Sequence, residues 1–144
     1  MDDRIEQDIT INAPLDRVWE LVSEPGWWVP SAVVAAVDHT PGHQVVRDSE
    51  KWGRFPVEVV RVDPKTYAAF RWSSHAPGAE LAPGNTTLVE FRVELAGGAV
   101  RVTVVESGFA ALDAPGSVRE QSLKDNTGGW REELAGLRER AESA

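Results

Sequence analysis

Glu106 is the residue of this sequence whose position best suits chemistry in a buried pocket. In the stretch VRVTVVESGF, Val100, Val102 and Val104 share one face of a predicted strand, because side chains alternate between the two faces. The next residue of that parity is Glu106. Facing a low-dielectric pocket, its carboxyl group would have a raised pKa and could orient a ligand or transfer a proton. The alternative is a carboxylate at the strand end, in water or paired with a base such as Arg54.

Few other side chains could join Glu106 in an acid–base set. Ser74 and His75 are neighbours in the chain, but Ser74 has neither a nucleophile elbow nor a paired base in the sequence. His39 and His43 bracket the turn TPG, and no carboxylate completes a metal-binding pattern around them. The sequence therefore predicts no metal site and no cofactor, and it assigns no catalytic residue.

Two more predicted strands place apolar side chains on one face. In TYAAFRWSS and TLVEFRVE, apolar residues alternate with charged or polar ones, which is typical of strands with one buried face. The faces that we expect to point inward carry Phe70, Trp72, Ser74, Val89, Phe91 and Val93.

The elements that must position these residues follow in a simple order. RIEQDITIN predicts a strand, NAPLDRVWELVS predicts a short amphipathic helix, and EPGWWVPSAVV is too rich in Pro and Gly for a long helix and predicts turns. An antiparallel meander follows, with strands near residues 43–50, 52–62, 66–74, 86–95 and 99–108. The long connection 73–85 is either a lid or rim of a site, or a floppy insertion.

A long helix is predicted to end the chain. Ser117 and Glu120 have the spacing of a capping box, and an apolar stripe follows them. Gly128 and Gly129 interrupt this helix directly before Trp130, and each glycine costs roughly 1 kcal/mol relative to alanine. We expect either tight packing against Trp27 or Trp28, or a flexible bend that serves access to a cavity. Both interpretations forbid bulk at the two glycines.

Composition limits the classes of function. The 144 residues fit one domain, residues 1–144. The net charge of −8 disfavours a nucleic-acid partner, and the absence of Cys excludes thiolate chemistry. The N-terminal stretch has no signal-peptide pattern and no apolar run approaches the roughly 18 residues of a membrane span, so we expect a cytoplasmic chain with no membrane span.

Strands followed by a terminal helix exclude a doubly wound parallel fold and predict an α+β chain. Within that order, the sequence resembles the AHSA1-like branch of the SRPBCC (START/Bet v 1-like) superfamily in five stretches: ITINAPLDRVWELVSEPGWW, RVDPKTYAAFRW, TTLVEFRVE, VRVTVVESGF and GGWREELAGLRER. The resemblance implies a helix-grip fold, in which a curved antiparallel sheet wraps around the long C-terminal helix and encloses an apolar cavity.

The resemblance also implies where a ligand would lie. Of the six tryptophans, Trp19 belongs to the stripe of its helix and is expected in the core. Trp28, Trp72 and Trp130 lie on elements that the resemblance places around the cavity, where they serve either as walls for a flat apolar ligand or as core. The ligand-binding residues predicted from parity and resemblance together are Trp28, Phe70, Trp72, Ser74, Val89, Phe91, Val104, Glu106, Phe109, Thr127 and Trp130.

Three functions remain open for such a domain, because relatives include lipid and hormone binders, polyketide aromatase/cyclases and Hsp90 co-chaperone domains. We expect non-covalent binding of a small hydrophobic molecule, aromatic or lipid-like. The alternatives are a cyclase-like or hydrolytic enzyme that uses the same cavity, and an Hsp90-activator-like interaction module, whose chaperone partner rests on family analogy only. The sequence does not specify the oligomeric state.

Overall fold

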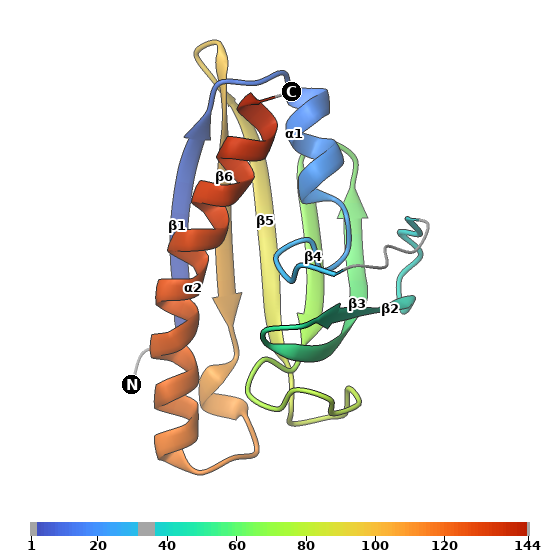
Figure 1. The fold of residues 1–144 in the computed structure, drawn as a ribbon, viewed down its shortest axis with the longest axis vertical. Coiled ribbons are helices and arrows are strands. Elements are labelled where there is room, and N and C mark those ends of the chain that lie inside the picture. The colour runs from blue at the N-terminus through green and yellow to red at the C-terminus, as the bar shows by residue number, and fades with distance from the viewer. Residues whose placement is uncertain (1–2, 32–36, 144) are drawn as a thin grey trace.

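The computed structural model describes residues 3–31 and 37–143, which form one antiparallel sheet and a long helix (Figure 1). The six strands lie in the order β1-β6-β5-β4-β3-β2, so β2 to β6 are a meander and β1 pairs with β6. This arrangement confirms the predicted α+β helix-grip class. The elements are β1 (Arg4–Ile11), α1 (Leu15–Val22), β2 (Gln44–Ser49), β3 (Gly53–Asp63), β4 (Tyr67–Trp72), β5 (Thr87–Ala96), β6 (Ala99–Ser107), the 3-10 helix η1 (Phe109–Ala111) and α2 (Gly116–Glu142).

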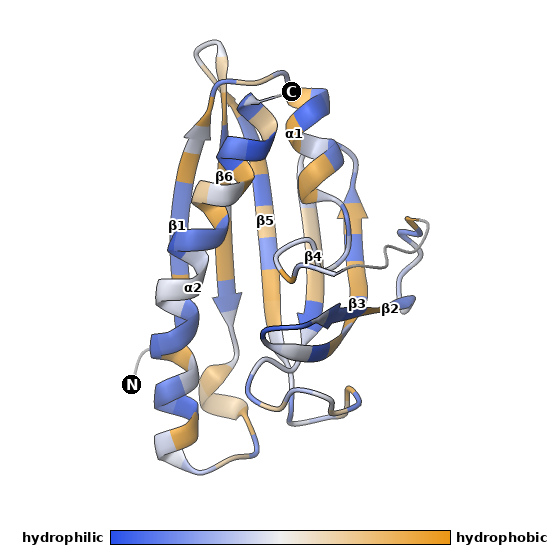
Figure 2. Ribbon diagram, in the orientation of Figure 1, coloured by the Kyte–Doolittle hydropathy of each residue, from blue (hydrophilic) through white to orange (hydrophobic). Residues whose placement is uncertain are grey.

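One face of the sheet is buried, as the alternation of residues predicted. Phe70 of β4, Phe91 of β5 and Val104 of β6 are fully buried, and the helices cover this face. Figure 2 shows the alternation of apolar and polar residues along β5 and the mixed surface of α2. The core therefore lies between the inner face of the sheet and the two helices.

The start of α2 differs from the prediction. The helix begins at Gly116, with Pro115 as its N-cap residue and no side-chain cap. The amides of Val118 and Arg119 donate instead to the carbonyl of Pro115, at 2.9 and 3.0 Å. The capping box is thus wrong: Ser117 lies inside the first turn, because the backbone of Pro115 already supplies the helix start.

The two glycines of α2 are neither packed closely nor placed at a break. The helix is continuous from Gly116 to Glu142, and a Cβ atom added at Gly128 or Gly129 would meet no neighbouring atom within 4 Å. Two residues correspond to about 200° of rotation in an α-helix, so Gly128 points away from the side that buries Trp130. Close packing at these positions is therefore wrong, whereas a flexible bend that serves access stays a prediction.

The segment after α1 carries Trp27 and Trp28 on turns, as predicted for residues 24–31; the rest of the predicted turn region, 32–34, lies outside the described residues. Arg47 of β2 holds this segment, since its Nε donates to the carbonyl of Val29 at 2.9 Å and its guanidinium lies 3.7 Å from the Glu24 carboxylate. Gly26, with φ of 75°, lies directly over the Arg47 side chain, where a Cβ would come within 2.6 Å of Cγ. The two indoles are therefore fixed through Arg47.

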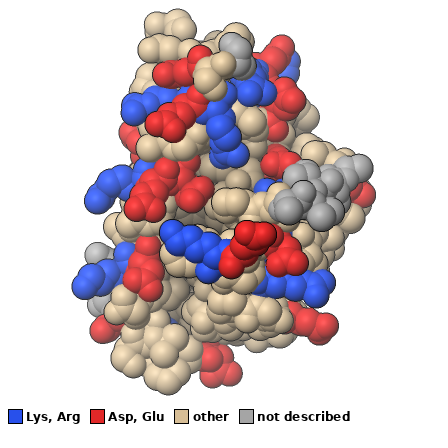
Figure 3. All heavy atoms as spheres, in the orientation of Figure 1, with Lys and Arg blue, Asp and Glu red and all other residues tan. Residues whose placement is uncertain are grey.

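The surface shows no single-sign patch on the face that carries α2, where Figure 3 shows acidic and basic side chains interspersed. Within the described part of the chain, helices of sufficient length and apolarity to cross a membrane are absent.

Candidate ligand site around Glu106

Glu106 lies in the interior and its carboxylate accepts four hydrogen bonds. Its side chain has no exposed surface. Oε1 accepts from Trp130 Nε1 at 2.8 Å and from Asn126 Nδ2 at 3.0 Å, both on α2. Oε2 accepts from Trp72 Nε1 of β4 at 2.8 Å and from Thr87 Oγ1 of β5 at 2.6 Å. One carboxylate thus connects three strands and the helix.

The strand-end alternative for Glu106 is wrong. β1 and β5 flank this end of β6, where Glu106 pairs with Ile5 on one side and with Val89 on the other. Residues of α2 cover the inner face above it, which closes the position to water. Arg54, the base considered as its partner, is exposed on β3. Strand parity therefore predicted the direction of Glu106 correctly.

The electrostatics of Glu106 combine two opposing effects. Burial raises the pKa of the carboxyl group because it disfavours the charged form, and hydrogen bonds from Thr87, Trp130, Trp72 and Asn126 offset part of this shift. Indole and amide N–H groups only donate, so the arrangement suits a carboxylate. The Thr87 hydroxyl can also accept, which makes Oε2 the oxygen that can hold a proton when the group is neutral.

Aromatic rings surround this carboxylate. The Trp28 ring lies 5.4 Å from Trp72 and 5.5 Å from Trp130, measured between ring centroids, so it contacts both indoles that bind Glu106. Phe91 and Phe70 lie 5.6 and 5.8 Å from the same ring. Trp27 packs at 5.3 Å against Phe91, and Phe55 packs at 5.4 Å against Trp72. These seven side chains are called the aromatic cluster below.

Three buried polar atoms near the aromatic cluster have no hydrogen-bond partner among the described residues. They are Nε1 of Trp27, Nε1 of Trp28 and Oγ of Ser73. Buried polar groups are almost always hydrogen-bonded, and an unpaired one costs about 1–3 kcal/mol. The aromatic cluster therefore contains two indole N–H groups, those of Trp27 and Trp28, that an additional molecule could satisfy.

A second layer of polar groups extends from Glu106 to the loop after β4. Asn126 Nδ2, which donates to Glu106, also lies 3.0 Å from Ser74 Oγ, and Ser74 Oγ lies 3.4 Å from the hydroxyl of Ser122. His75 makes no side-chain hydrogen bond to this layer within the described chain. The amide of Asn126 separates Ser74 from the carboxylate, so Ser74 has no base next to it.

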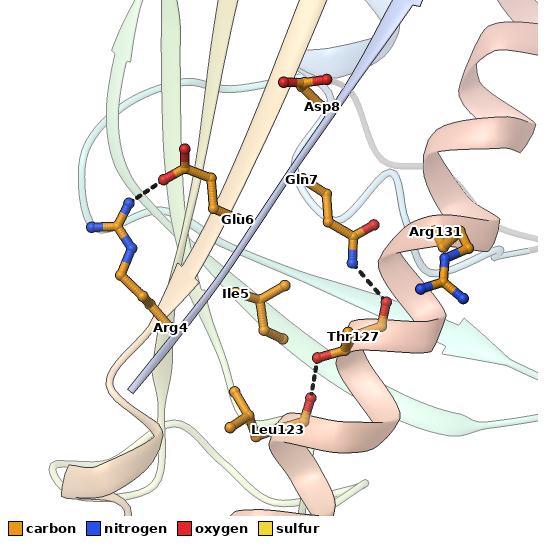
Figure 4. Close-up of a pocket in the computed structure, with 8 residues that line it drawn as sticks. All are labelled: Arg4, Ile5, Glu6, Gln7, Asp8, Leu123, Thr127 and Arg131. Atoms are coloured by element: carbon orange, nitrogen blue, oxygen red, sulfur yellow. Dashed lines mark hydrogen bonds and ion pairs between the residues drawn. The ribbon is translucent and has the colours of Figure 1, made fainter. Parts of the chain in front are cut away.

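The predicted site residues separate into two groups. Most lie together in the interior: Trp28, Phe70, Trp72, Val89, Phe91, Val104, Glu106, Phe109 and Trp130 are buried, and Ser74 lies at their edge. Thr127 lies elsewhere. Its carbonyl accepts from Gln7 Nε2 at 2.8 Å and its hydroxyl donates to the carbonyl of Leu123 at 2.7 Å, in a polar groove of about 780 Å³ between β1 and α2 (Figure 4).

Three residues of the site were not among those predicted from the sequence: Thr87, Asn126 and Trp27. Thr87 shares the parity of Val89 and Phe91, so strand alternation could have identified it. Asn126 lies four residues before Trp130 on the same helix face, and helical spacing could have identified it. Trp27 had no such signal, because turns impose no periodicity.

The comparisons with known proteins agree with this architecture. Residues 12–142 match the sequence profile of the family described as Activator of Hsp90 ATPase homolog 1-like protein. Among curated proteins, none matches the chain significantly.

Solved structures show the same fold at low sequence identity. DynU16, from the dynemicin biosynthetic locus, is 24% identical with a TM-score of 0.71 over 96% of this chain; the match spans 47% of DynU16, so this chain corresponds to about half of that protein. MLL2253 from Mesorhizobium loti is 16% identical with a TM-score of 0.72, covering 95% of each chain. The Aha1 dimer from Colwellia psychrerythraea is 13% identical with a TM-score of 0.70, covering 96% of each chain.

Proposed function

This chain belongs to the family of Activator of Hsp90 ATPase homolog 1-like proteins, and on that premise we propose that it binds a small, largely apolar molecule between α2 and the inner face of the sheet. The observation that carries the proposal is the fully buried Glu106 within the aromatic cluster. Residues 1–144 act in this proposal as one ligand-binding domain.

The energetics of the interior support a binding role. A buried ionised group usually costs stability compared with well-packed apolar residues of the same volume, so Glu106 is an expensive way to fill a core. The unpaired indole N–H groups of Trp27 and Trp28 add to this cost. Ligand sites are mostly apolar with a few convergent polar groups, and the interior around Glu106 has this composition.

Access is provided in this proposal by the turn segment that carries Trp27 and Trp28. Each of their rings packs against both Phe91 of the sheet and Trp130 of α2, which also contact each other at 5.7 Å. The segment is held by Arg47 and by turns, whereas the surrounding rings are held by ladders of backbone hydrogen bonds. Displacing this segment costs less than opening the sheet, so an incoming molecule would replace one or both indoles.

The enzymatic alternative has weaker support. A hydrolytic mechanism through Ser74 needs a base that takes the hydroxyl proton, and the neighbouring group is the Asn126 amide, which cannot act as one. Glu106 itself is enclosed by four donors. Binding therefore accounts for more of the geometry than catalysis does.

Native mass spectrometry of freshly purified protein, followed by titration with small aromatic compounds, tests the proposal. We expect a retained small molecule or a saturable change of tryptophan emission, because four of the seven rings of the aromatic cluster are tryptophans. Trp52→Phe removes the emission of an exposed tryptophan and serves as the background variant. The proposal is contradicted if the purified protein retains no small molecule and no apolar compound produces a saturable response.

A further inference from the structure

The charge of Glu106 has no partner of opposite sign in the described structure. Its four hydrogen-bond partners are neutral: two indoles, one hydroxyl and one amide. No ion pair of the described chain includes Glu106, and the groups that shift its pKa include none that is charged. By contrast, Arg47, the other buried charged side chain, lies beside Glu24. The site therefore contains one uncompensated negative charge in an apolar enclosure.

The geometry restricts how a ligand can compensate this charge. Each carboxylate oxygen already accepts two hydrogen bonds, which uses its lone pairs. A ligand N–H group would have to compete for these lone pairs with an indole, an amide or a hydroxyl. A nitrogen that carries positive charge and no N–H group, as in a quaternary ammonium group, is attracted through space without that competition.

The aromatic cluster offers the second half of such a site. Trp72 and Trp130 bind the carboxylate by their N–H edges, so a group that replaces the Trp28 indole, which packs against both rings, would contact these rings and not their donors. Phe70 and Phe91 lie within 5.8 Å of the Trp28 ring, which occupies the middle of this arrangement. Faces of Trp and Phe attract cations, and several rings around one position form the aromatic cages that bind quaternary ammonium groups.

We propose that the molecule bound beside Glu106 is an organic cation, with an aromatic or otherwise apolar body and a quaternary nitrogen. The body takes the place of the Trp28 indole against Phe91 and Trp130, and the cationic nitrogen lies among the rings next to the Glu106 carboxylate. This inference rests on the proposed function and specifies its ligand class. An anionic ligand is excluded by the same charge, because two carboxylates in one apolar enclosure repel each other.

Three probes separate charge from shape: benzyltrimethylammonium and its neutral carbon isostere neopentylbenzene, which share one shape, and the smaller anion phenylacetate. Their affinities are measured by tryptophan fluorescence at about pH 8, above the ordinary range of carboxyl groups. We expect the cation to bind roughly tenfold or more tightly than the neutral isostere, and phenylacetate not to bind. Equal or weaker binding of the cation would overturn the inference and leave the proposed function standing. No binding of any probe would overturn both.

Variants assign the effect to Glu106. Glu106→Gln should remove the preference for the cation over neopentylbenzene, whereas Glu50→Gln, which removes the same charge from an exposed turn, should keep it. Thr87→Val keeps the carboxylate and removes one of its neutral donors, so it should also keep the preference. This third variant preserves the test where Glu106→Gln folds poorly: because its pKa for Glu106 is higher, a loss of the preference that persists when the pH is raised further would contradict the assignment to charge. A preference that persists in folded Glu106→Gln would overturn the role of Glu106.

Discussion

Protonation of Glu106 makes the free energy of unfolding depend on pH. Burial raises its pKa above that of a glutamate in the unfolded chain, which titrates near 4.5. Between these two values, the folded state keeps the proton that the unfolded state has released. The unfolded state then binds fewer protons, and the free energy of unfolding falls as pH rises through this window, before it levels off above the folded pKa.

The first prediction concerns this pH dependence. In the wild type, the contribution of Glu106 to the slope should approach about −1.4 kcal/mol per pH unit inside the window. Urea unfolding at a series of pH values checks it, with Glu106→Gln for comparison. The half-buried Glu133, whose pKa burial also raises, remains in both proteins, so the difference between the curves isolates Glu106. Parallel curves would show that Glu106 titrates as an ordinary glutamate.

The second prediction concerns the indole donors. Trp130→Phe keeps an aromatic ring but removes the N–H group that donates to Oε1, so the free energy of unfolding should fall by about 1.5–3 kcal/mol, as for hydrogen bonds to charged groups. The pKa of Glu106 should rise further, because this hydrogen bond lowers it. Denaturant midpoints and carboxyl NMR titration measure the two effects. Trp52→Phe, at an exposed position, should change stability by less than about 0.5 kcal/mol; equal losses in both variants would argue against the donor role.

At the scale of elements, α2 and the turn segment after α1 use glycine for different purposes. Gly128 lies in a regular helix with open space around its missing Cβ. Gly26 has a positive φ and faces the Arg47 side chain at a distance that admits no Cβ. Helix propensity therefore decides the effect of substitution at Gly128, whereas backbone strain and contact decide it at Gly26.

The third prediction follows from this contrast. Gly128→Ala should raise the free energy of unfolding by up to about 1 kcal/mol, because alanine is the better helix former and meets no neighbour. Gly26→Ala should lower it by more than about 1 kcal/mol. Chemical denaturation of both variants gives the comparison. A destabilised Gly128→Ala protein would contradict the open space at Gly128 and would favour close packing there.

The fourth prediction concerns the attachment of the turn segment. Arg47→Met keeps much of the apolar stem but removes the guanidinium that binds the carbonyl of Val29. Amide hydrogen exchange in residues 24–31 should accelerate, and the rates of ligand entry and exit should both rise, because the segment with Trp27 and Trp28 opens more easily. Exchange and stopped-flow fluorescence measure these effects, with the exposed Arg54→Met as the control. Unchanged exchange in Arg47→Met would show that the segment is held by its rings alone.

Sequence periodicity predicted those parts of the structure that are themselves periodic. Alternation in strands predicted the inward faces of β4, β5 and β6 and the direction of Glu106. Its environment was harder to predict, because the donors come from strands and a helix that only the tertiary fold brings together. Turns have no sequence period, so the packing of Trp27 and Trp28 could not be predicted from the sequence. The rotation of α2 placed Thr127 on the β1 side, which helical spacing alone did not resolve.

At the scale of the whole molecule, the Glu106 network joins the two layers of the fold. Its donors belong to β4, β5 and α2, so a ligand that alters it acts on sheet and helix together. Binding to the folded state alone stabilises it by RT ln(1 + [L]/Kd), or about 2.7 kcal/mol at a hundredfold excess over Kd. Ligand-dependent unfolding temperatures therefore report binding independently of tryptophan emission.

The net charge of −8 gives the molecule a field that attracts any cation, so interior and surface binding must be separated. The fifth prediction is that raising ionic strength from about 0.05 to about 0.5 M weakens benzyltrimethylammonium binding by less than roughly threefold, because salt screens buried charges much less than exposed ones. In Glu106→Gln the electrostatic part of the residual binding should be salt-sensitive, since it comes from charges on the surface. Isothermal titration of both proteins at the two ionic strengths provides the measurement. If wild type and Glu106→Gln lose affinity in parallel, the cation is held by the general field of the protein and the buried carboxylate has no part in selecting it.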